Sequence, residues 1–372
     1  MATSDAEEPS PRVTVVFLLY RSPTVVPALV ESLARQAHPG FARQADWLEA
    51  LFMDDGSGDG TAEAVERALA AAGRPAHWRL VSNPSNLGLA GTLNRAFGLA
   101  RAPYVVTCHL DCRFGDERYV ASLLGHIEGR PRAAAITGKP AVAPGAPLPF
   151  AEKLNVIANL MDVLPDDSPD ELVPVGFAEG RCDVFRAEAL RSVGLYDPHL
   201  RISGEDQVLA AKLRRAGWEI LQAPRLVYHL SVSGEQDSVA KIVRHQRLFG
   251  RTDPYILFAV PGTHAGLLGA RAGRNRLRRA LLRGSQAAAS VLYPVALAAL
   301  VAGWPAAAAL ALAAVAVPRV LLYRRHAAAV GLRAGEAARL ALVQPLLDVA
   351  FTEGLVEGFF LLARGSRAGP ID

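Results

Sequence analysis

Residues 104–114, YVVTCHLDCRF, follow an apolar run with polar side chains that could hold a metal ion and a diphosphate. The first four residues are β-branched or aromatic, which predicts a strand buried on both faces. His109, Asp111 and Arg113 alternate with less polar residues, so the period of two in a strand places their side chains on one side. An imidazole and a carboxylate at the carboxyl end of a strand could bind a divalent cation on a diphosphate. A structural role also stays open, with Asp111 capping the next helix and His109 in the core.

A second group of candidates lies in MDDGSGDGT, at the end of a short apolar segment at 51–53. The glycines and the serine predict a tight turn, and Thr61 could cap the helix after it. Turn chemistry does not require both Asp54 and Asp55, because adjacent like charges repel unless a cation or a hydrogen-bond donor faces them. Gly88 lies at the start of a later helix whose free amide groups would suit an anion, although small residues there equally allow close helix packing.

Strands that alternate with helices would position these residues. Apolar segments of strand length occur at residues 13–20, 51–53, 79–82, 104–107 and 133–137. Segments with helical spacing separate them, which predicts an α/β fold with a doubly wound, parallel sheet. In such sheets the ligand lies outside the carboxyl ends of the strands, which is where the polar candidates fall.

Four motifs in order, VVFLLY, MDDGSGDGT, NPSNLGLAGTLNRAF and YVVTCHLDCRF, resemble the nucleotide-sugar half of family 2 glycosyltransferases of the GT-A fold. The later segment from GRCDVF to LVYHL is similar to that family's acceptor half, including Gly-Glu-Asp at 204–206, Gly217-Trp218 and His229. The resemblance covers residues 12–250. It implies a Rossmann-like GT-A sheet and a UDP-, GDP- or dTDP-sugar as donor.

The resemblance also implies a role for each motif residue at the donor. Asp54 or Asp55 would contact the base and ribose, and Asp111 would be the last acid of the DxD motif that holds a metal on the diphosphate. Two arginines would stand where related enzymes grip that diphosphate. The implied nucleotide-sugar-binding residues are Asp54, Asp55, Gly88, Asn94, Asp111, Arg244 and Arg247.

The implied cofactor is a divalent metal, Mn²⁺ or Mg²⁺, held by His109, Asp111 and His229. His109 is a departure, because the family usually has an acid at the first position of DxD. Imidazole binds Mn²⁺ but suits Mg²⁺ poorly, and His109 could instead touch the diphosphate as a cation. The first strand also departs, ending in Tyr20-Arg21 where the family commonly has Tyr-Asn.

The implied general base is Asp206, with Glu205 beside it as a second catalytic candidate. An inverting sugar transfer needs a base opposite the leaving group, and the diphosphate that leaves needs its charge neutralised by a metal or by arginines. Inversion itself rests on the resemblance. The structural alternative is that both acids favour the dipole at the start of the helix through residues 208–213.

The net charge, the N-terminal tail and the cysteines bear on the partners and the cellular compartment of the protein. The 372 residues are 51% hydrophobic and carry a net charge of +4, which does not indicate a nucleic-acid partner. Residues 1–11 form a polar tail that is too acidic for a secretory signal peptide. The three cysteines, Cys108, Cys112 and Cys182, are an odd number without zinc spacing, which predicts reduced thiols.

The C-terminal third of the chain contains two long apolar stretches. Residues 287–304 and 306–323 are apolar stretches of a length that can span a bilayer, although alanine-rich core helices would be an alternative. We expect a GT-A domain at 12–250, divided at 138, then a basic interfacial linker at 251–284. A transmembrane hairpin would follow at 285–325 and an interfacial segment at 326–372. Arginines flank the hairpin on both sides, which predicts that both ends face the cytoplasm.

Together these features predict a glycosyltransferase anchored in the inner or plasma membrane as a multi-pass protein, with its catalytic domain in the cytoplasm. Its acceptor would be a lipid-linked or cell-envelope glycan, as in polysaccharide biosynthesis. One alternative is a polyprenyl-phosphate glycosyltransferase, whose phosphate acceptor needs less help from a base. A second is a non-catalytic membrane module that binds a nucleotide sugar or a partner enzyme.

Overall fold

The structure, a computed structural model, describes residues 10–142, 148–164, 171–200, 203–230, 238–260 and 272–365, and in residues 272–279 the backbone only. The chain forms two compact units. The first contains residues 1–139 and 168–233, and the second contains residues 140–167 and 234–372.

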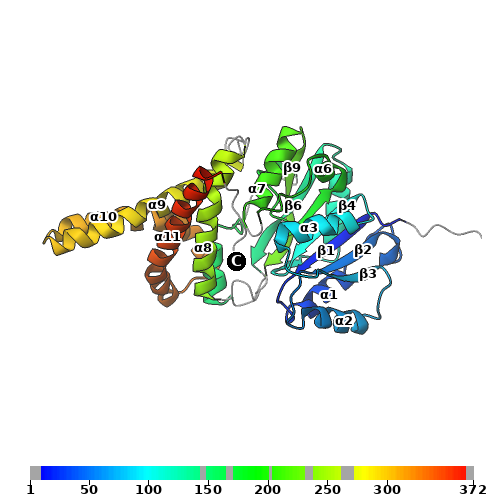
Figure 1. The fold of residues 1–372 in the computed structure, drawn as a ribbon. Coiled ribbons are helices and arrows are strands. Elements are labelled where there is room, and N and C mark those ends of the chain that lie inside the picture. The colour runs from blue at the N-terminus through cyan, green and yellow to red at the C-terminus, as the bar shows by residue number, and fades with distance from the viewer. Residues whose placement is uncertain are drawn as a thin grey trace, which may run out of the picture. The chain divides into compact units, whose positions relative to one another are not determined.

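The first unit is built on a single mixed sheet (Figure 1). The strands run in the spatial order β3-β2-β1-β4-β8-β6-β9-β5, and β7 pairs with β9. The first four strands of this order are mutually parallel, whereas β8 is antiparallel to β4 and to β6. The bounds are β1 Val13–Leu19, β2 Leu48–Asp54, β3 Trp78–Ser82, β4 Tyr104–His109, β5 Cys112–Phe114, β6 Ala133–Val142, β7 Val173–Pro174, β8 Cys182–Arg186 and β9 Glu219–Leu230.

All five predicted strands are present, but the sheet is not purely parallel. The antiparallel strand β8 was not predicted, because an aspartate interrupts its short apolar run. The polar alternation after β4 also contains a turn at residues 110–111, so Asp111 lies between two strands rather than within one. Helices cover the sheet: α1 Val26–Ala34, α2 Thr61–Ala71, α3 Gly88–Leu99, α4 Tyr119–Glu128, α6 Ala187–Ser192 and α7 Glu205–Arg215, with a 3₁₀ turn at Gln44–Asp46.

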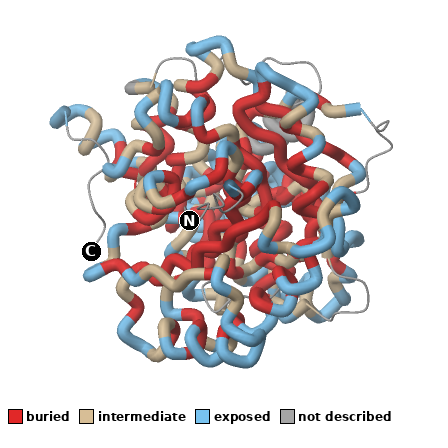
Figure 2. Tube along the Cα trace, turned by 90° about the vertical axis from the view of Figure 1, so that its right-hand side faces the viewer, coloured by how far each residue is buried: buried red, intermediate tan, exposed pale blue. Residues whose placement is uncertain are grey.

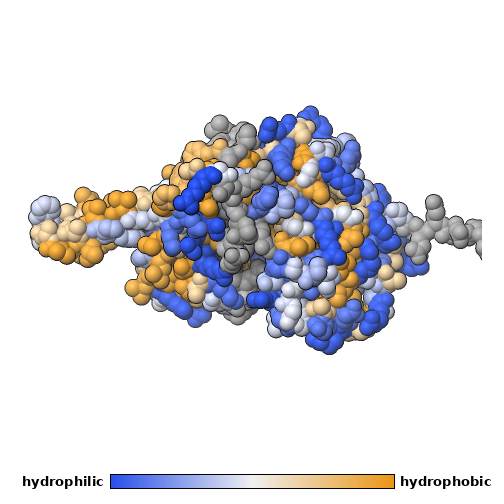
Figure 3. Space-filling model, in the orientation of Figure 1, coloured by the Kyte–Doolittle hydropathy of each residue, from blue (hydrophilic) through white to orange (hydrophobic). Residues whose placement is uncertain are grey.

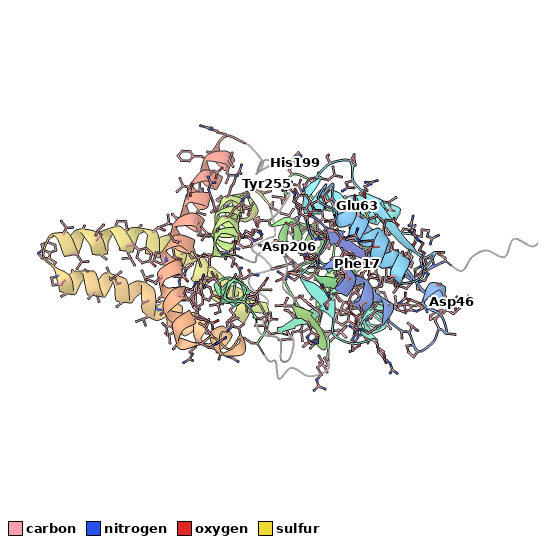
Figure 4. All side chains as sticks on the ribbon, turned by 90° about the horizontal axis from the view of Figure 1, so that it is seen from below. Phe17, Asp46, Glu63, His199, Asp206 and Tyr255 are labelled. Carbon is pink, nitrogen blue, oxygen red and sulfur yellow. The ribbon has the colours of Figure 1, made fainter. Side chains whose placement is uncertain are left out.

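Burial on both faces explains why the central strands read as continuous apolar runs. Every residue of β1 and β2 is buried, and Figure 2 shows buried residues concentrated in the strands. On one face Val16 and Leu51 pack with residues of α3, α6 and α7. On the other, Phe17 stacks on Phe52 with ring centroids 4.9 Å apart; Phe17 is labelled in Figure 4. Helices on both faces of parallel strands give this pattern.

The second unit is helical. It contains α5 Phe150–Ala158, α8 Val239–Pro254, a π-helical turn at Tyr255–Ala259, α9 Ala272–Val301, α10 Pro305–Ala329 and α11 Ala334–Ala363. Helices α8 and α11 lie side by side (Figure 1). A Cβ added at Gly354 would overlap the carbonyl oxygen of Arg247, and one at Gly250 would overlap that of Phe351. Only glycine permits backbones to approach this closely. These contacts group residues 239–250 with the C-terminal helices, whereas the sequence placed them with the sheet.

Two helices in the described part of the chain are long and apolar enough to cross a membrane, Ala280–Val301 and Pro305–Ala329. Only 22% and 33% of their most apolar windows are buried inside the protein. Large apolar side chains along them face outward, including Leu297, Val301 and Leu310, and Figure 3 shows hydrophobic surface along this hairpin. The alternative of two alanine-rich core helices would require most of that surface to be covered.

Candidate active site

Asp54 and Asp55 lie at the carboxyl end of β2, and their carboxylates face hydrogen-bond donors. Asp55 accepts hydrogen bonds from the backbone amides of Leu87 and Gly88, at 2.8 and 2.9 Å, and from Asn83 Nδ2 at 2.7 Å. The anion at the N-terminus of α3 is therefore the carboxylate of Asp55 itself. Asp54 Oδ1 accepts a hydrogen bond from the Ser57 hydroxyl at 2.5 Å, which closes the glycine-rich turn. Contact of either acid with a nucleotide stays a prediction.

We expect Asp55→Asn to lower the free energy of unfolding by about 1–3 kcal/mol, because an amide nitrogen would face donors that need an acceptor. Thermal unfolding of the purified protein measures this. Asp59→Asn is the matched control, since Asp59 is exposed and caps Thr61, a position that asparagine fills equally well. Equal, small shifts for both variants would show that Asp55 does not anchor α3.

Asn94 connects α3 to the segment before α7. Its Nδ2 donates to the carbonyl oxygen of Tyr196, and the amide of Tyr196 donates to Asn94 Oδ1, both at 3.0 Å. Burial raises the pKa of the Tyr196 phenol well above its usual value, and the charges of Glu205, Asp183 and Asp206 raise it further. Asn94 thus fixes a residue that lies within electrostatic range of three acids, and its contact with a donor stays a prediction.

The Asp111 carboxylate is paired with Arg181, the residue directly before the neighbouring strand β8. Arg181 Nη1 lies 2.5 Å from Asp111 Oδ2, and Arg181 Nε lies 3.1 Å from Glu179 Oε2. Burial raises the pKa of Asp111, but the charge of Arg181, the nearby His109 and the hydrogen bonds from Cys112 and Arg181 together outweigh burial and hold that pKa below its usual value. Burial lowers the pKa of His109 to about 4, so its imidazole is neutral at pH 7. Asp111 contacts Arg181 and Cys112 and does not cap α4.

Among the described residues, neither Nε2 of His109 nor Nδ1 of His229 has a hydrogen-bond partner, and both ring nitrogens are buried. His229 lies on β9, opposite Arg113 of β5. Neutral imidazoles and a carboxylate are ligand types that Mn²⁺ accepts, so these residues fit a divalent cation in kind. Within the described ranges, no three His, Cys, Asp or Glu side chains gather closely enough to hold one without further ligands. Substrate phosphates commonly supply such further ligands.

Glu205 and Asp206 occupy the first turn of α7, after Gly204 with a φ of +84°. The two carboxyl groups differ in environment. Glu205 is buried and its Oε2 has no partner, so burial, followed by the charge of Asp206, raises its pKa to about 8. Asp206 is partly exposed, and its Oδ1 accepts a hydrogen bond from the Gln207 amide at 2.7 Å; it is labelled in Figure 4. Adjacent acids in different environments are typical of acid–base sites.

Asp183 is an acid that the sequence reading missed. It lies on β8 beside Thr107 of β4 and is fully buried. Its Oδ2 accepts a hydrogen bond from the Gly180 amide at 2.7 Å, while its Oδ1 has no partner. Burial raises the pKa of Asp183 to about 7. Buried polar atoms are normally paired, so the atoms of Asp183, Glu205, His109 and His229 that have no partner within the described residues are candidates for contact with a ligand.

Comparison with known proteins identifies the domain that carries these residues. The profile of Glycosyl transferase family 2 matches residues 14–193. Residues 14–193 belong to glycosyl transferase family 2. The chain is accordingly a glycosyltransferase, and the match includes Asp54, Asp55 and Asp111 but ends before Asp206. No curated protein matches the sequence.

One solved structure agrees with this assignment at the level of the fold. The mannosyltransferase PcManGT from Pyrobaculum calidifontis, in complex with GDP-Man and Mn²⁺, has a TM-score of 0.57 and 19% identity, over 94% of this chain and 88% of that chain. GalNAc-T7 with UDP, GalNAc and Mn²⁺ has a TM-score of 0.48 and 14% identity, over 73% of this chain and 54% of that chain. The similarity to PcManGT shows that the glycosyltransferase has the GT-A fold.

The arginines expected at the diphosphate lie on α8, in the second unit of the glycosyltransferase. Arg244 is exposed. Arg247 lies 3.2 Å from Glu353 and 3.3 Å from Glu357, both on α11. The acids that interrupt the apolar α11 therefore serve as partners for α8, and a role of these two arginines at the diphosphate stays a prediction.

Two residues of this site, Arg181 and Asp183, were missed because β8 was missed. A signal was present, since the segment GRCDVF places a cation and an acid next to a short apolar run. A charged residue in a buried strand usually has a specific partner. The antiparallel register, Cys108 beside Cys182, then determines which partners those are.

Proposed function

We propose that this glycosyltransferase moves a sugar from a nucleotide-sugar donor to a lipid-linked or cell-envelope glycan acceptor, with inversion and with Asp206 as the general base. The observation that carries the proposal is the acid pair at the start of α7. Glu205 is protonated at neutral pH because burial raises its pKa to about 8, so it is not available as a base. The carboxylate of the partly exposed Asp206 would then accept the proton of an acceptor hydroxyl.

The donor would lie at the carboxyl ends of β1, β2 and β4, where open α/β sheets bind ligands. Asp54 and Asp55 shape the turn at which the base and ribose would be held. PcManGT contains GDP-Man and Mn²⁺, which supports a nucleotide sugar and a divalent metal here. Asp111 would hold the metal, with the unpaired nitrogens of His109 and His229 near it, and a bound metal would neutralise charge on the diphosphate.

We further propose that α9 and α10 cross the membrane as a hairpin with both ends in the cytoplasm, which would make the protein multi-pass. Arg283 precedes the apolar part of α9, and Arg324 and Arg325 end that of α10, which is the distribution expected for cytoplasmic ends. Helix α11 would lie in the interface, because one face packs on α8 while another exposes apolar side chains. Those exposed side chains are Leu342, Leu346, Val349, Val356, Phe359 and Phe360.

Turnover of a panel of UDP-, GDP- and dTDP-sugars by the detergent-solubilised protein tests the proposed function. Native membrane lipids serve as acceptors, and each donor is incubated with Mn²⁺, with Mg²⁺ and with chelator. We expect one donor class to be consumed, with the sugar recovered in the lipid or glycan fraction. Donor binding without transfer under every condition would instead favour the non-catalytic alternative.

A further inference from the structure

In the proposed reaction the charge of Arg181 has no role. Its guanidinium lies against Asp111, at 2.5 Å, and against Glu179, at 3.1 Å. The Arg181 and Asp111 side chains are only 16% and 19% exposed. A guanidinium held by two carboxylates in a largely buried place occupies the position at which a cation on Asp111 is expected.

The backbone holds Arg181 in this place. The amide of His109 donates to the carbonyl oxygen of Arg181 at 2.8 Å. Directly after Arg181, Cys182 pairs with Cys108 in the register of β8 against β4. The guanidinium therefore reaches Asp111 from the strand beside it, and the pairing of the sheet places the two groups together.

The charges of this cluster do not suit a diphosphate. Asp111 and Glu179 formally carry two negative charges against the single positive charge of Arg181. A diphosphate brought next to this cluster would meet net negative charge, which opposes binding at short range. The same arginine, released from Asp111, would be a bidentate partner for phosphate oxygens.

We propose that Arg181 is a counter-ion of Asp111 that exchanges partners: it leaves Asp111 when a divalent cation binds there and then binds the donor's diphosphate. The proposal rests on the proposed function, because it assumes a nucleotide donor at Asp111. The exchange of partners has opposite effects on the affinity for the metal and on the affinity for the nucleotide. Arg181 weakens metal binding, since the two cations compete for one carboxylate, and it strengthens nucleotide binding once the metal is present.

Binding to the full-length protein in detergent tests both consequences, with Mn²⁺, UDP and GDP as probes in isothermal titration calorimetry. We expect Arg181→Gln to bind Mn²⁺ alone about tenfold more tightly or better, because a competing cation is gone. With Mn²⁺ saturating, the same variant should bind the preferred nucleotide about 10- to 100-fold more weakly, the usual effect of losing a charged hydrogen bond. In both titrations, the affinity of Arg181→Lys should lie between that of Arg181→Gln and that of the wild type.

The control is Arg101→Gln, which removes another arginine bound to a buried acid, Glu49, at 2.7 Å. This variant should bind Mn²⁺ and the nucleotide with affinities within about twofold of those of the wild type. Thermal unfolding of every variant separates misfolding from altered binding, and the lysine variant keeps the test valid if the glutamine variant unfolds. If Arg181 only stabilises the fold, Arg181→Gln should bind both Mn²⁺ and the nucleotide more weakly than the wild type. If Arg181 only competes with the metal, Arg181→Gln should bind both more tightly. Either result overturns the proposal.

Two further outcomes separate this inference from the proposed function. If the wild-type protein binds nucleotide equally well with chelator and with Mn²⁺, Arg181 does not exchange with a metal, and the transferase proposal stands. If neither UDP, GDP nor dTDP binds under any condition, the transferase proposal fails and the role of Arg181 fails with it.

Discussion

Asp206→Asn should lower the rate of sugar transfer about 10²- to 10⁴-fold, the usual contribution of a general base. Asparagine keeps the size of the side chain and can still accept the hydrogen bond from Gln207, but it cannot take a proton from the acceptor. Binding of the nucleotide donor should change by less than about threefold, because the lost interaction belongs to the transition state. Steady-state transfer rates and calorimetric donor binding on the same preparation measure the two quantities.

Glu205→Gln is the matched control for that prediction. At pH 7 the buried Glu205 is protonated, because its pKa is raised to about 8, and glutamine has the same shape as the neutral acid. Transfer at pH 7 should therefore stay within about threefold of wild type. A large loss in Glu205→Gln, with little loss in Asp206→Asn, would exchange the two roles and make Glu205 the general base.

The same pair predicts how stability depends on pH. The Glu205 pKa is raised from 4.5 in the unfolded chain to about 8 in the folded protein, so the folded state holds an extra proton between these pH values. The free energy of unfolding should therefore decrease as pH rises through this window, by at most about 1.4 kcal/mol per pH unit. Denaturant unfolding at several pH values measures the slope, which Glu205→Gln should reduce. An unchanged slope would mean that other groups cause it.

The transfer experiment also distinguishes the two kinds of acceptor. A phosphate acceptor is already ionised at neutral pH, so it gains little from a base. If Asp206→Asn keeps most of its activity while Asp111→Asn loses it, the polyprenyl-phosphate alternative is favoured over a glycan acceptor. Loss of transfer activity in both Asp206→Asn and Asp111→Asn favours an acceptor that reacts through a hydroxyl group.

Much of the fold could be predicted because, in the first half of the chain, the local sequence patterns indicate the same strands and turns that the tertiary structure contains. Segments such as Val13–Leu19 are apolar over a strand length, and turn residues such as Gly56 and Gly58 follow β2 with positive φ. The register of the antiparallel β8 could not be predicted, since it depends on pairing with residues 74 to 82 positions earlier in the chain. Single-sequence periodicity carries no information about such a partner.

The candidate residues could be named from the sequence, whereas their contacts could not. The strand pattern proposed Asp111 and the family resemblance implied Asp206, but nothing local to Asp55 shows that its carboxylate binds the start of α3. Partner choice for a buried charge is decided by the tertiary fold. The same holds in the C-terminal helices, where Arg319 interrupts α10 and Asp348 interrupts α11. Read separately, these charges weaken two apolar segments, whereas in the structure they are partners.

Asp348→Ala should lower the free energy of unfolding by about 3–5 kcal/mol, because it leaves a buried arginine without its counter-ion. Asp348 is fully buried and accepts hydrogen bonds from helices α9, α10 and α11. The donors are Tyr293 Oη at 3.0 Å, Arg319 Nη2 at 2.8 Å and Gln344 Nε2 at 2.9 Å. Thermal unfolding in detergent should show the loss directly.

Two control variants decide whether charge or packing causes that loss. Glu31→Ala removes an exposed ion pair with Arg35, whose side chains are 67% and 65% exposed, and should cost less than about 0.5 kcal/mol. The double variant Arg319→Met with Asp348→Leu removes both buried charges and should recover most of the stability, since apolar pairs often replace buried ion pairs at no cost. If the double variant is as unstable as Asp348→Ala, the three helices depend on the hydrogen bonds of Asp348 rather than on neutralising Arg319. In that case Asp348→Asn, which keeps an acceptor oxygen for Tyr293 and Gln344, should be the more stable of the single variants.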